Sequence, residues 1–283
     1  MPKSLTLAAA QRLRPDPSQA NNRAMLAAPE VTARIGLIIP SSNRLTEPHM
    51  RRYAPPGVEV HITRLRMTGA NHVPLAQLLP RMIEATLALA DARCDVIVFH
   101  CTASSMEAGL DGERLVLDGM RGAAPGARVA STASAVLSAV AALDIRRVVL
   151  ISPYLAATHQ HEIDFLTEAG LSIVGGRSLG LAGGDQYIAV SPAEWLRLGQ
   201  AEMRPDADGL FLSCTNIHSP EVVEPLEALI DKPVLTSNQA VLWYALRACG
   251  QQLSVPGLGR LCQRPLPGSC PPAARAQQSL TGR

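Results

Sequence analysis

This chain has few aromatic residues and almost no excess of charge of either sign. Phe, Trp and Tyr make up only 3% of its 283 residues, and the formal net charge at pH 7 is +2. Nucleic-acid-binding proteins usually carry clustered Lys and Arg interleaved with aromatic side chains, so this composition argues against a nucleic-acid partner. The hydrophobic fraction of 47% comes mainly from Ala, Val, Leu and Ile, which suits buried parallel strands covered by helices.

Long apolar runs are lacking as well. None approaches the roughly 20 residues that a helix needs to cross a bilayer, and we therefore expect no membrane partner. The apolar N-terminal stretch, residues 5–10, is short and is followed by Arg-Pro rather than by a clean signal-peptide cleavage site. These absences predict a cytoplasmic protein.

Motifs that bind metals or nucleotides are absent too. Six cysteines, at positions 94, 101, 214, 249, 262 and 270, occur without a CxxC pair, which argues against a zinc ribbon and fits a reducing compartment. His159 and His161 lie two apart on a predicted helix, so they point away from each other and cannot chelate one metal well. The Gly-Gly-Asp-Gln stretch at 183–186 lacks a GxGxxG pattern and is expected to be a loop. We therefore expect neither a metal nor a cofactor.

A repeat organises the residues that are present. Three pairs of segments match in the same order: 34–41 with 147–154, 95–102 with 208–215, and 129–137 with 234–242. In the central pair an Asp opens an apolar run that stops at Cys-Thr, which predicts a buried strand delivering Cys101 or Cys214 to its C-terminal tip. The chain is thus predicted to contain two copies of one α/β unit. The alternative is that any two strands of parallel sheets look alike.

The repeat also predicts how the chain is divided. Residues 33–143 should form a first lobe with Cys101, and residues 144–260 a second lobe with Cys214. We expect an α/β fold with two pseudo-symmetric lobes, each a parallel sheet flanked by helices, and an active site in the cleft between them. Residues 1–32 and 261–283 carry little periodicity, which predicts a disordered leader and a disordered tail.

Local patterns predict the individual elements. Strands are expected at 35–39, 58–65, 96–100, 129–131, 147–152, 209–213 and 234–236. Helices are expected at 46–53, 75–90, 134–143, 156–169, 192–203, 221–230 and 239–249.

Polar residues follow several of the predicted strands. Asn43 lies in a turn at the end of the first strand, where it could contact a ligand or stabilise its own turn. Tyr154 takes the matching place in the second copy, where it could donate to a substrate carboxylate or pack beneath the next helix. The small residues 102–105, which include Thr102 and Ala103, offer N–H and hydroxyl donors that suit an anion-accepting turn.

The two matched cysteines are the candidate catalytic residues. A thiol at a strand end beside a helix N-terminus is expected to have a lowered pKa, because the partial positive charge there stabilises the thiolate. Cys101 and Cys214 would face each other across the cleft, one acting as base or nucleophile and the other as acid. The alternative is a pair of buried structural cysteines.

These motifs give the chain a family resemblance. The carrying segments are Pro-Ser-Ser-Asn at 40–43, His-Cys-Thr-Ala-Ser-Ser at 100–105, Ser-Pro-Tyr at 152–154, Ser-Cys-Thr-Asn at 213–216 and Pro-Val-Leu-Thr-Ser-Asn-Gln-Ala at 233–240. Over residues 33–260 the chain resembles the aspartate/glutamate racemase superfamily, and within it the branch of maleate cis-trans isomerases and arylmalonate decarboxylases.

The resemblance implies roles for the candidate residues. Cys101 would attack a substrate double bond to form a succinyl-cysteine adduct, and Cys214 would donate the proton. Asn43 and Tyr154 match the family's carboxylate-binding residues. The N–H groups that follow each cysteine, at Thr102, Ala103 and Thr215, would hold further carboxylate oxygens.

The resemblance further implies a cofactor-independent isomerase acting on a small mono- or dicarboxylate, with conversion of maleate to fumarate as the expected reaction. An amino-acid or hydroxy-acid racemase, an arylmalonate-type decarboxylase and an inactive carboxylate-binding module are the alternatives, and a homodimer is left open. The decarboxylases keep only the second cysteine, so Cys101 argues against simple decarboxylation. Asp185 stands near a position where the isomerases carry Asn and would repel a dicarboxylate unless Gln186 takes that place, and the hydroxyl-rich turn at 102–105 is nearer the racemases and decarboxylases.

Overall fold

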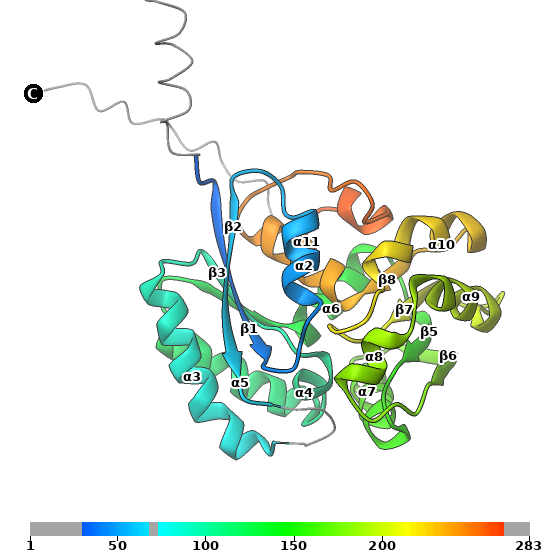
Figure 1. Cartoon of the computed structure of the whole chain (residues 1–283), viewed down its shortest axis with the longest axis horizontal. Coiled ribbons are helices and arrows are strands. Elements are labelled where there is room, and N and C mark those ends of the chain that lie inside the picture. Colours follow the sequence, from blue (N-terminus) through cyan, green and yellow to red (C-terminus); the bar gives the residue numbers. More distant parts are fainter. Residues whose placement is uncertain (1–29, 68–72, 269–283) are drawn as a thin grey trace, which may run out of the picture. The chain divides into compact units, whose positions relative to one another are not determined.

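The computed structural model describes residues 30–67 and 73–268, which form two parallel four-stranded sheets (Figure 1). The first sheet has the strand order β2-β1-β3-β4, and the second has the order β6-β5-β7-β8. Every strand pairing is parallel, and the second order repeats the first with each number raised by four. The predicted pair of pseudo-symmetric α/β lobes is therefore confirmed.

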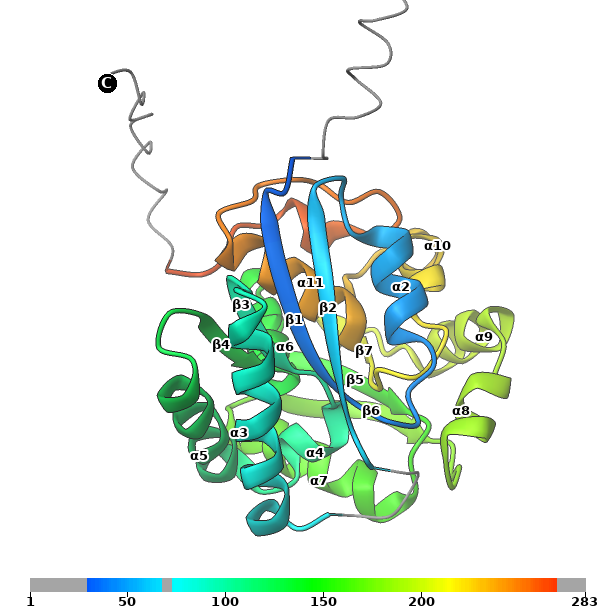
Figure 2. The same ribbon diagram turned by 60° about the vertical axis from the view of Figure 1, so that its left-hand side comes forward.

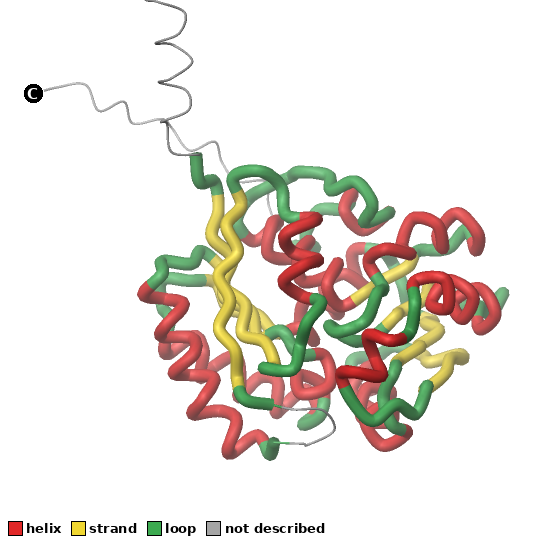
Figure 3. Tube along the Cα trace, viewed as in Figure 1, coloured by secondary structure: helices red, strands yellow, loops and turns green. Residues whose placement is uncertain are grey.

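The elements alternate along the chain as a parallel sheet requires (Figure 3). The strands are β1 Ala33–Pro40, β2 Val58–Leu65, β3 Val96–Phe99, β4 Arg128–Ser131, β5 Arg147–Ser152, β6 Ser172–Ser178, β7 Gly209–Leu212 and β8 Val234–Thr236. The helices of the first lobe are α2 Thr46–Tyr53, α3 Leu75–Asp91, α4 Thr102–Met106, α5 Gly109–Ala123 and α6 Thr132–Ala142. Those of the second are α7 Ala156–Glu168, α8 Gly184–Ala189, α9 Pro192–Glu202, η1 Pro220–Val222, α10 Val223–Ile230, α11 Ser237–Ala248 and η2 Arg260–Gln263.

Each central strand is buried on both faces, which explains its continuous apolar run. Along β1, Leu37 packs into a core shared by both lobes, while its neighbour Ile38 packs into a separate cluster under α3 and α5. In β5, Leu150 joins the shared core and Val149 packs under α9 and α10. The shared core places α6 against α11, the helices that follow the last strand of each sheet (Figure 2). The lobes therefore associate through equivalent helices.

Three segments differ from the sequence predictions. Residues 183–186 were expected to form a loop, but residues 184–189 form α8. Strand β6 and helix α5 were not predicted. Gly175 and Gly176 weaken the strand pattern of β6, where Gly176 has φ +139° and a Cβ would lie 1.8 Å from a backbone oxygen of β5.

The C-terminal segment is packed further than predicted. The disordered tail was expected to begin at residue 261, yet Leu261 and Cys262 are buried in η2. Arg247 on α11 fixes this segment by donating hydrogen bonds to the carbonyl oxygens of Cys262 and Arg264. The remainder of the tail, from 269, and the leader up to 29 lie outside the described residues. In the described part of the chain, none of the helices is long and apolar enough to cross a membrane.

Candidate active site

A cavity of about 330 Å³ opens where the C-terminal ends of strands from both sheets meet. Six of the seven residues predicted for the site line it: Asn43, Cys101, Ala103, Tyr154, Cys214 and Thr215. Thr102 is buried, and its hydroxyl group donates to the Ser237 hydroxyl over 2.8 Å. The two sequence copies thus bring both candidate thiols to one cavity, as the parallel topology predicts.

Cys101 follows β3 and is the N-cap residue of α4. Its thiol group donates to the Ser104 hydroxyl over 3.4 Å, and the Ser104 backbone N–H donates to the sulfur. Burial raises the pKa of the Cys101 thiol, and the two contacts with Ser104 lower it by a smaller amount. Cys101 is partly exposed to the cavity, which leaves its sulfur open to a reactant.

Cys214 follows β7 in a strained backbone conformation, with φ +143°. Its backbone N–H donates to the Ser237 hydroxyl over 3.2 Å, and its sulfur accepts from the backbone N–H of Asn216 over 3.3 Å. Burial raises the pKa of the Cys214 thiol to about 12, against the opposing effect of a hydrogen bond from the Tyr154 hydroxyl. At neutral pH this group therefore holds its proton, as a proton donor must.

The expected lowering of the thiol pKa is not found. The argument from sequence relied on the helix N-terminus beside Cys101, but α4 has only five residues, and burial has the larger effect. The fold favours protonated thiols at both positions. A thiolate at Cys101 must consequently be stabilised by something beyond this short helix.

Asn43, which lines the cavity, connects the two lobes. Its Nδ2 donates to the carbonyl oxygen and the hydroxyl of Thr215, over 3.2 and 3.0 Å. Its Oδ1 accepts from the backbone N–H groups of Leu45 and Thr46, which begin α2. These four bonds use the full hydrogen-bonding capacity of the amide. Asn43 therefore stabilises its own turn, as one of the two alternatives held, and it also stabilises the turn at Thr215 in the opposite lobe.

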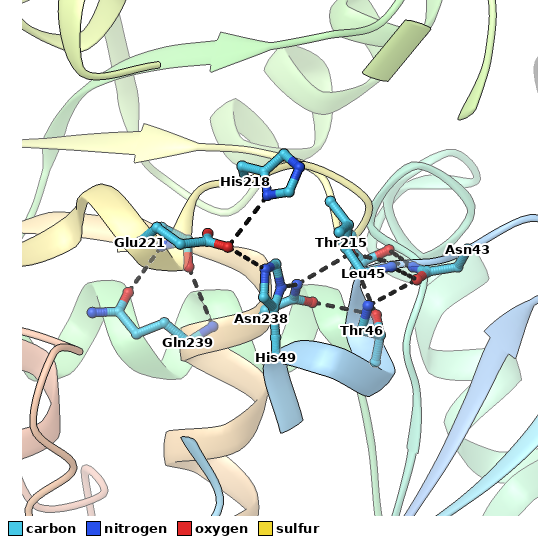
Figure 4. A network of polar contacts seen from close by, with 10 residues as sticks. Asn43, Leu45, Thr46, His49, Thr215, His218, Glu221, Asn238 and Gln239 are labelled. Atoms are coloured by element: carbon cyan, nitrogen blue, oxygen red, sulfur yellow. Dashed lines mark hydrogen bonds and ion pairs between the residues drawn. The ribbon is translucent and has the colours of Figure 1, made fainter. Parts of the chain in front are cut away.

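The Thr215 carbonyl is held from three directions (Figure 4). Besides Asn43, the Thr46 hydroxyl donates to it over 3.3 Å, and the Asn238 amide over 3.1 Å. This carbonyl belongs to the peptide between Thr215 and Asn216, so the three bonds hold the turn directly after the strained residue Cys214. Such over-determination is what allows an unfavourable backbone conformation to persist at a functional site.

Asn238 links this turn to the buried residues His49 and His100, and Figure 4 shows the bond to His49. Its Nδ2 donates to Thr215 and to Nδ1 of His49, over 2.7 Å in the latter case, while its Oδ1 accepts from Nε2 of His100 over 2.7 Å. The carbonyl of Thr215 can only accept, which fixes the orientation of the amide. His49 therefore carries its proton on Nε2, and His100, the residue before Cys101, carries one on its own Nε2.

His49, His218 and Glu221 form one cluster, among the described residues, whose atoms could together hold a metal ion. Nε2 of His49 lies 3.0 Å from Oε1 of Glu221, and Nδ1 of His218 lies 3.3 Å from the same oxygen (Figure 4). A metal on Nε2 of neutral His49 would require a proton on Nδ1, which faces the Asn238 amide hydrogens. The cluster therefore suits hydrogen bonds between the lobes better than a metal.

Tyr154 and Tyr187 form an aromatic wall of the cavity. Their rings meet edge to face with centroids 5.7 Å apart. The Tyr154 side chain is buried, as one of the two alternatives predicted. Its hydroxyl group also forms a hydrogen bond with the sulfur of Cys214, one of the two candidate catalytic thiols. Burial raises the pKa of both phenols, so each keeps a proton to donate. Tyr187 was missed from the sequence because it lies in α8, directly after the stretch 183–186 that was expected to be a loop.

Other lining residues were also missed. Asn216 is buried and lines the cavity, with Oδ1 accepting from the backbone N–H of Arg44 over 2.9 Å. It directly follows the second Cys-Thr pair, which was the signal available in the sequence. Ser104 and the exposed residue His161 line the cavity too.

The two residues that departed from the family pattern do not belong to the described lining of the cavity. Asp185 is 91% exposed and forms an ion pair with Arg44. Gln186 accepts from the backbone N–H of Ala182 through Oε1 over 2.6 Å. Gly184 lines the cavity in their place, and a Cβ there would lie 3.2 Å from Nδ2 of Asn216. The charge of Asp185 is therefore paired with Arg44 and screened by solvent.

Comparison with known proteins identifies the family. A family model described as arylmalonate decarboxylase matches residues 35–262. The chain belongs to the arylmalonate decarboxylase family. This membership confirms the branch of the racemase superfamily that the motifs predicted.

Similar proteins within this family carry two activities. A maleate isomerase of Nocardia farcinica is 29% identical over 240 residues, which span 82% of this chain and 96% of that protein. An arylmalonate decarboxylase of Bordetella bronchiseptica is 33% identical over 141 residues, which span 49% of this chain and 59% of that protein.

Solved structures agree with these sequence comparisons. A mutant of the Nocardia farcinica maleate cis-trans isomerase with a covalently bound succinylcysteine intermediate has a TM-score of 0.76 at 28% identity, over 82% of this chain and 98% of that one. A liganded double mutant of arylmalonate decarboxylase has a TM-score of 0.75 at 26% identity, over 81% and 98%.

Proposed function

We propose that this protein is a cofactor-independent cis-trans isomerase that converts maleate to fumarate with Cys101 and Cys214. The observation that carries the proposal is that these two thiols, one from each lobe, line the same cavity. The similarity to maleate isomerases supports it, because one of those proteins forms a succinylcysteine intermediate. A small carboxylate substrate and a cytoplasmic location belong to the same proposal, and the five cysteines that the structure describes are all free thiols.

The proposed reaction needs a nucleophile and a proton donor and leaves both unchanged. The Cys101 thiolate adds to one alkene carbon while the Cys214 thiol gives its proton to the other, forming a C–S and a C–H bond. The former double bond can now rotate. Cys214 then removes the proton, the alkene re-forms and the C–S bond breaks, which releases the trans acid.

Donors around the thiols would hold the two carboxylates. The first N–H groups of a helix lack partners within the helix, so those of Thr102 and Ala103 are available beside Cys101. The Thr215 backbone and the Tyr187 hydroxyl supply donors on the opposite side. Tyr154 contacts the Cys214 sulfur, and in our proposal it orients that thiol toward the substrate carbon. Asn43 acts on the same centre through Thr215.

Mass spectrometry of single-cysteine variants tests the proposal. With maleate, Cys214→Ala should trap an adduct on Cys101, because the C–S bond forms while proton handling is impaired. Cys101→Ala is the matched control and should give no adduct. Fumarate formation by the unmodified protein should survive dialysis against a chelator.

Two results would redirect the assignment. Solvent deuterium exchange at Cα of an amino or hydroxy acid, without any adduct, would establish a racemase. Release of CO₂ from an arylmalonate that persists in Cys101→Ala would establish a decarboxylase, since that chemistry does not need the first cysteine.

A further inference from the structure

One buried carboxyl group lies beside the cavity and has no part in the proposed reaction. Glu162 on α7 is 0% exposed, and its Oε1 accepts a hydrogen bond from the hydroxyl of Ser213, the residue before Cys214. Its second oxygen, Oε2, has no hydrogen-bond partner among the residues that the structure describes. A buried carboxylate with one unsatisfied oxygen is unfavourable, whereas the neutral acid costs far less to bury.

The position of Glu162 places it behind the wall that carries the thiols. Thr158, four residues earlier on α7, lines the cavity, and residues four apart share one face of a helix. Glu162 therefore continues that face one turn deeper into the protein. Its bond to Ser213 connects it directly to the strand end that presents Cys214.

We propose that Glu162 is a positioning residue for the thiol pair, a carboxylic acid kept neutral behind the cavity so that a thiolate can form there. Burial raises the pKa of Glu162 to about 8, against the smaller opposing effect of Ser213. A negative charge on Glu162 would in turn raise the thiol pKa of both Cys101 and Cys214. This inference concerns thiol ionisation, so it stands or falls separately from the identity of the substrate.

Four titratable groups lie close enough to Glu162 for its negative charge to raise their pKa values. They are Cys101 before α4, Cys214 after β7, Tyr154 before α7 and Tyr187 on α8. Helix α7 also packs against α5 and β6. None of the ion pairs among the described residues includes Glu162, and its pKa is raised by burial against the opposing hydrogen bond from Ser213. Its charge state should therefore follow pH and not a salt bridge.

Alkylation kinetics without substrate test this inference. The rate at which iodoacetamide modifies Cys101 would be measured by peptide mass spectrometry from pH 6 to pH 10 in the full chain. Near pH 8 the unmodified protein should show a break, above which the rate rises less steeply. Glu162→Gln keeps an acceptor for Ser213 but cannot ionise, so its rate should rise without a break and exceed that of the unmodified protein roughly threefold or more at pH 9.5.

A surface carboxyl on the same helix provides the control. Asp164→Asn, which alters an exposed carboxyl of α7, should keep the break near pH 8. Identical profiles for Glu162→Gln and the unmodified protein would overturn the inference.

A second variant keeps the test valid if Glu162→Gln fails to fold. Ser213→Ala removes the hydrogen bond that lowers the Glu162 pKa, so the break should move to higher pH. If the break came from another group and Glu162 had only a structural role, Ser213→Ala would leave the pH of the break unchanged. An unmoved break in Ser213→Ala would therefore count against the inference, whatever the protein does with maleate.

Discussion

Nδ2 of Asn43 lies 3.0 Å from Oγ1 of Thr215, and this bond joins the first turn of one lobe to the cysteine turn of the other. A residue that resembles a substrate ligand in sequence is here a bridge between lobes. The turn that follows the strained residue Cys214 thus depends on side chains of the first lobe. This dependence, the burial of several ionisable groups and the packing of the η2 segment lead to four predictions.

Replacement of Asn43 should reduce both stability and turnover. Asn43→Ala loses four hydrogen bonds and leaves the buried Thr215 carbonyl with fewer donors, which should cost about 2–4 kcal/mol of unfolding free energy. Thr46→Val is the matched variant, because it removes only the shared hydroxyl contacts with the Thr215 carbonyl and the Asn238 amide oxygen, and it should cost about 1 kcal/mol. Urea denaturation and kcat measure the two effects. Unchanged stability with a raised KM alone would mean that Asn43 binds substrate instead.

The two wall tyrosines should have separable effects on the kinetics. Tyr154→Phe loses the hydrogen bond to Cys214, so kcat should fall by about 10²-fold, in the range of a misplaced acid–base group. Tyr187→Phe keeps the edge contact but removes a cavity hydroxyl, so it should mainly raise KM. Steady-state kinetics on both variants distinguishes these outcomes. Equal losses of kcat would contradict the assignment of Tyr154 to the thiol.

The stability advantage of Glu162→Gln over the unmodified protein should grow as pH rises from 5 to 8. The folded pKa of about 8 exceeds the ordinary value of 4.5, so between these pH values the native state holds a proton that the unfolded chain has released. Stability from this group therefore falls with increasing pH across that window and levels off above it. Urea titrations of both proteins at pH 5, 6.5 and 8 should show a growing advantage for the variant. A constant difference across the series would show that Glu162 is already ionised when folded.

Removal of the η2 segment should destabilise the fold. A chain that ends at Gly259 loses buried Leu261 and two carbonyl acceptors of Arg247, those of Cys262 and Arg264, and burial of one Leu side chain is worth about 1.5–3 kcal/mol. The reference is a chain that ends at Gly268, which retains all of these contacts. Thermal unfolding of the two truncations should differ by several degrees. Equal midpoints would show that η2 contributes little.

Much of the fold follows from local sequence patterns. The apolar runs at 35–39 and 148–151 are buried strands because both faces of a parallel sheet are covered, and the repeat fixes their matching places. Cys101 and Cys214 follow from the same logic, since each ends such a run. Segment 172–178 escaped because the glycines in it, required by a bulge against β5, erase the strand pattern.

The two lobes and the convergence of two cysteines follow from local sequence, because strand periodicity and repetition are encoded in neighbouring residues. Tertiary structure alone decided what those residues touch. Asn43 meets Thr215 across 172 positions of sequence, and Glu162 meets Ser213 across 51. Burial, which sets the charge of Cys214 and Glu162, depends on every element packed around them. No local pattern carries that information, so the ionisation of this site could be read only from the folded protein.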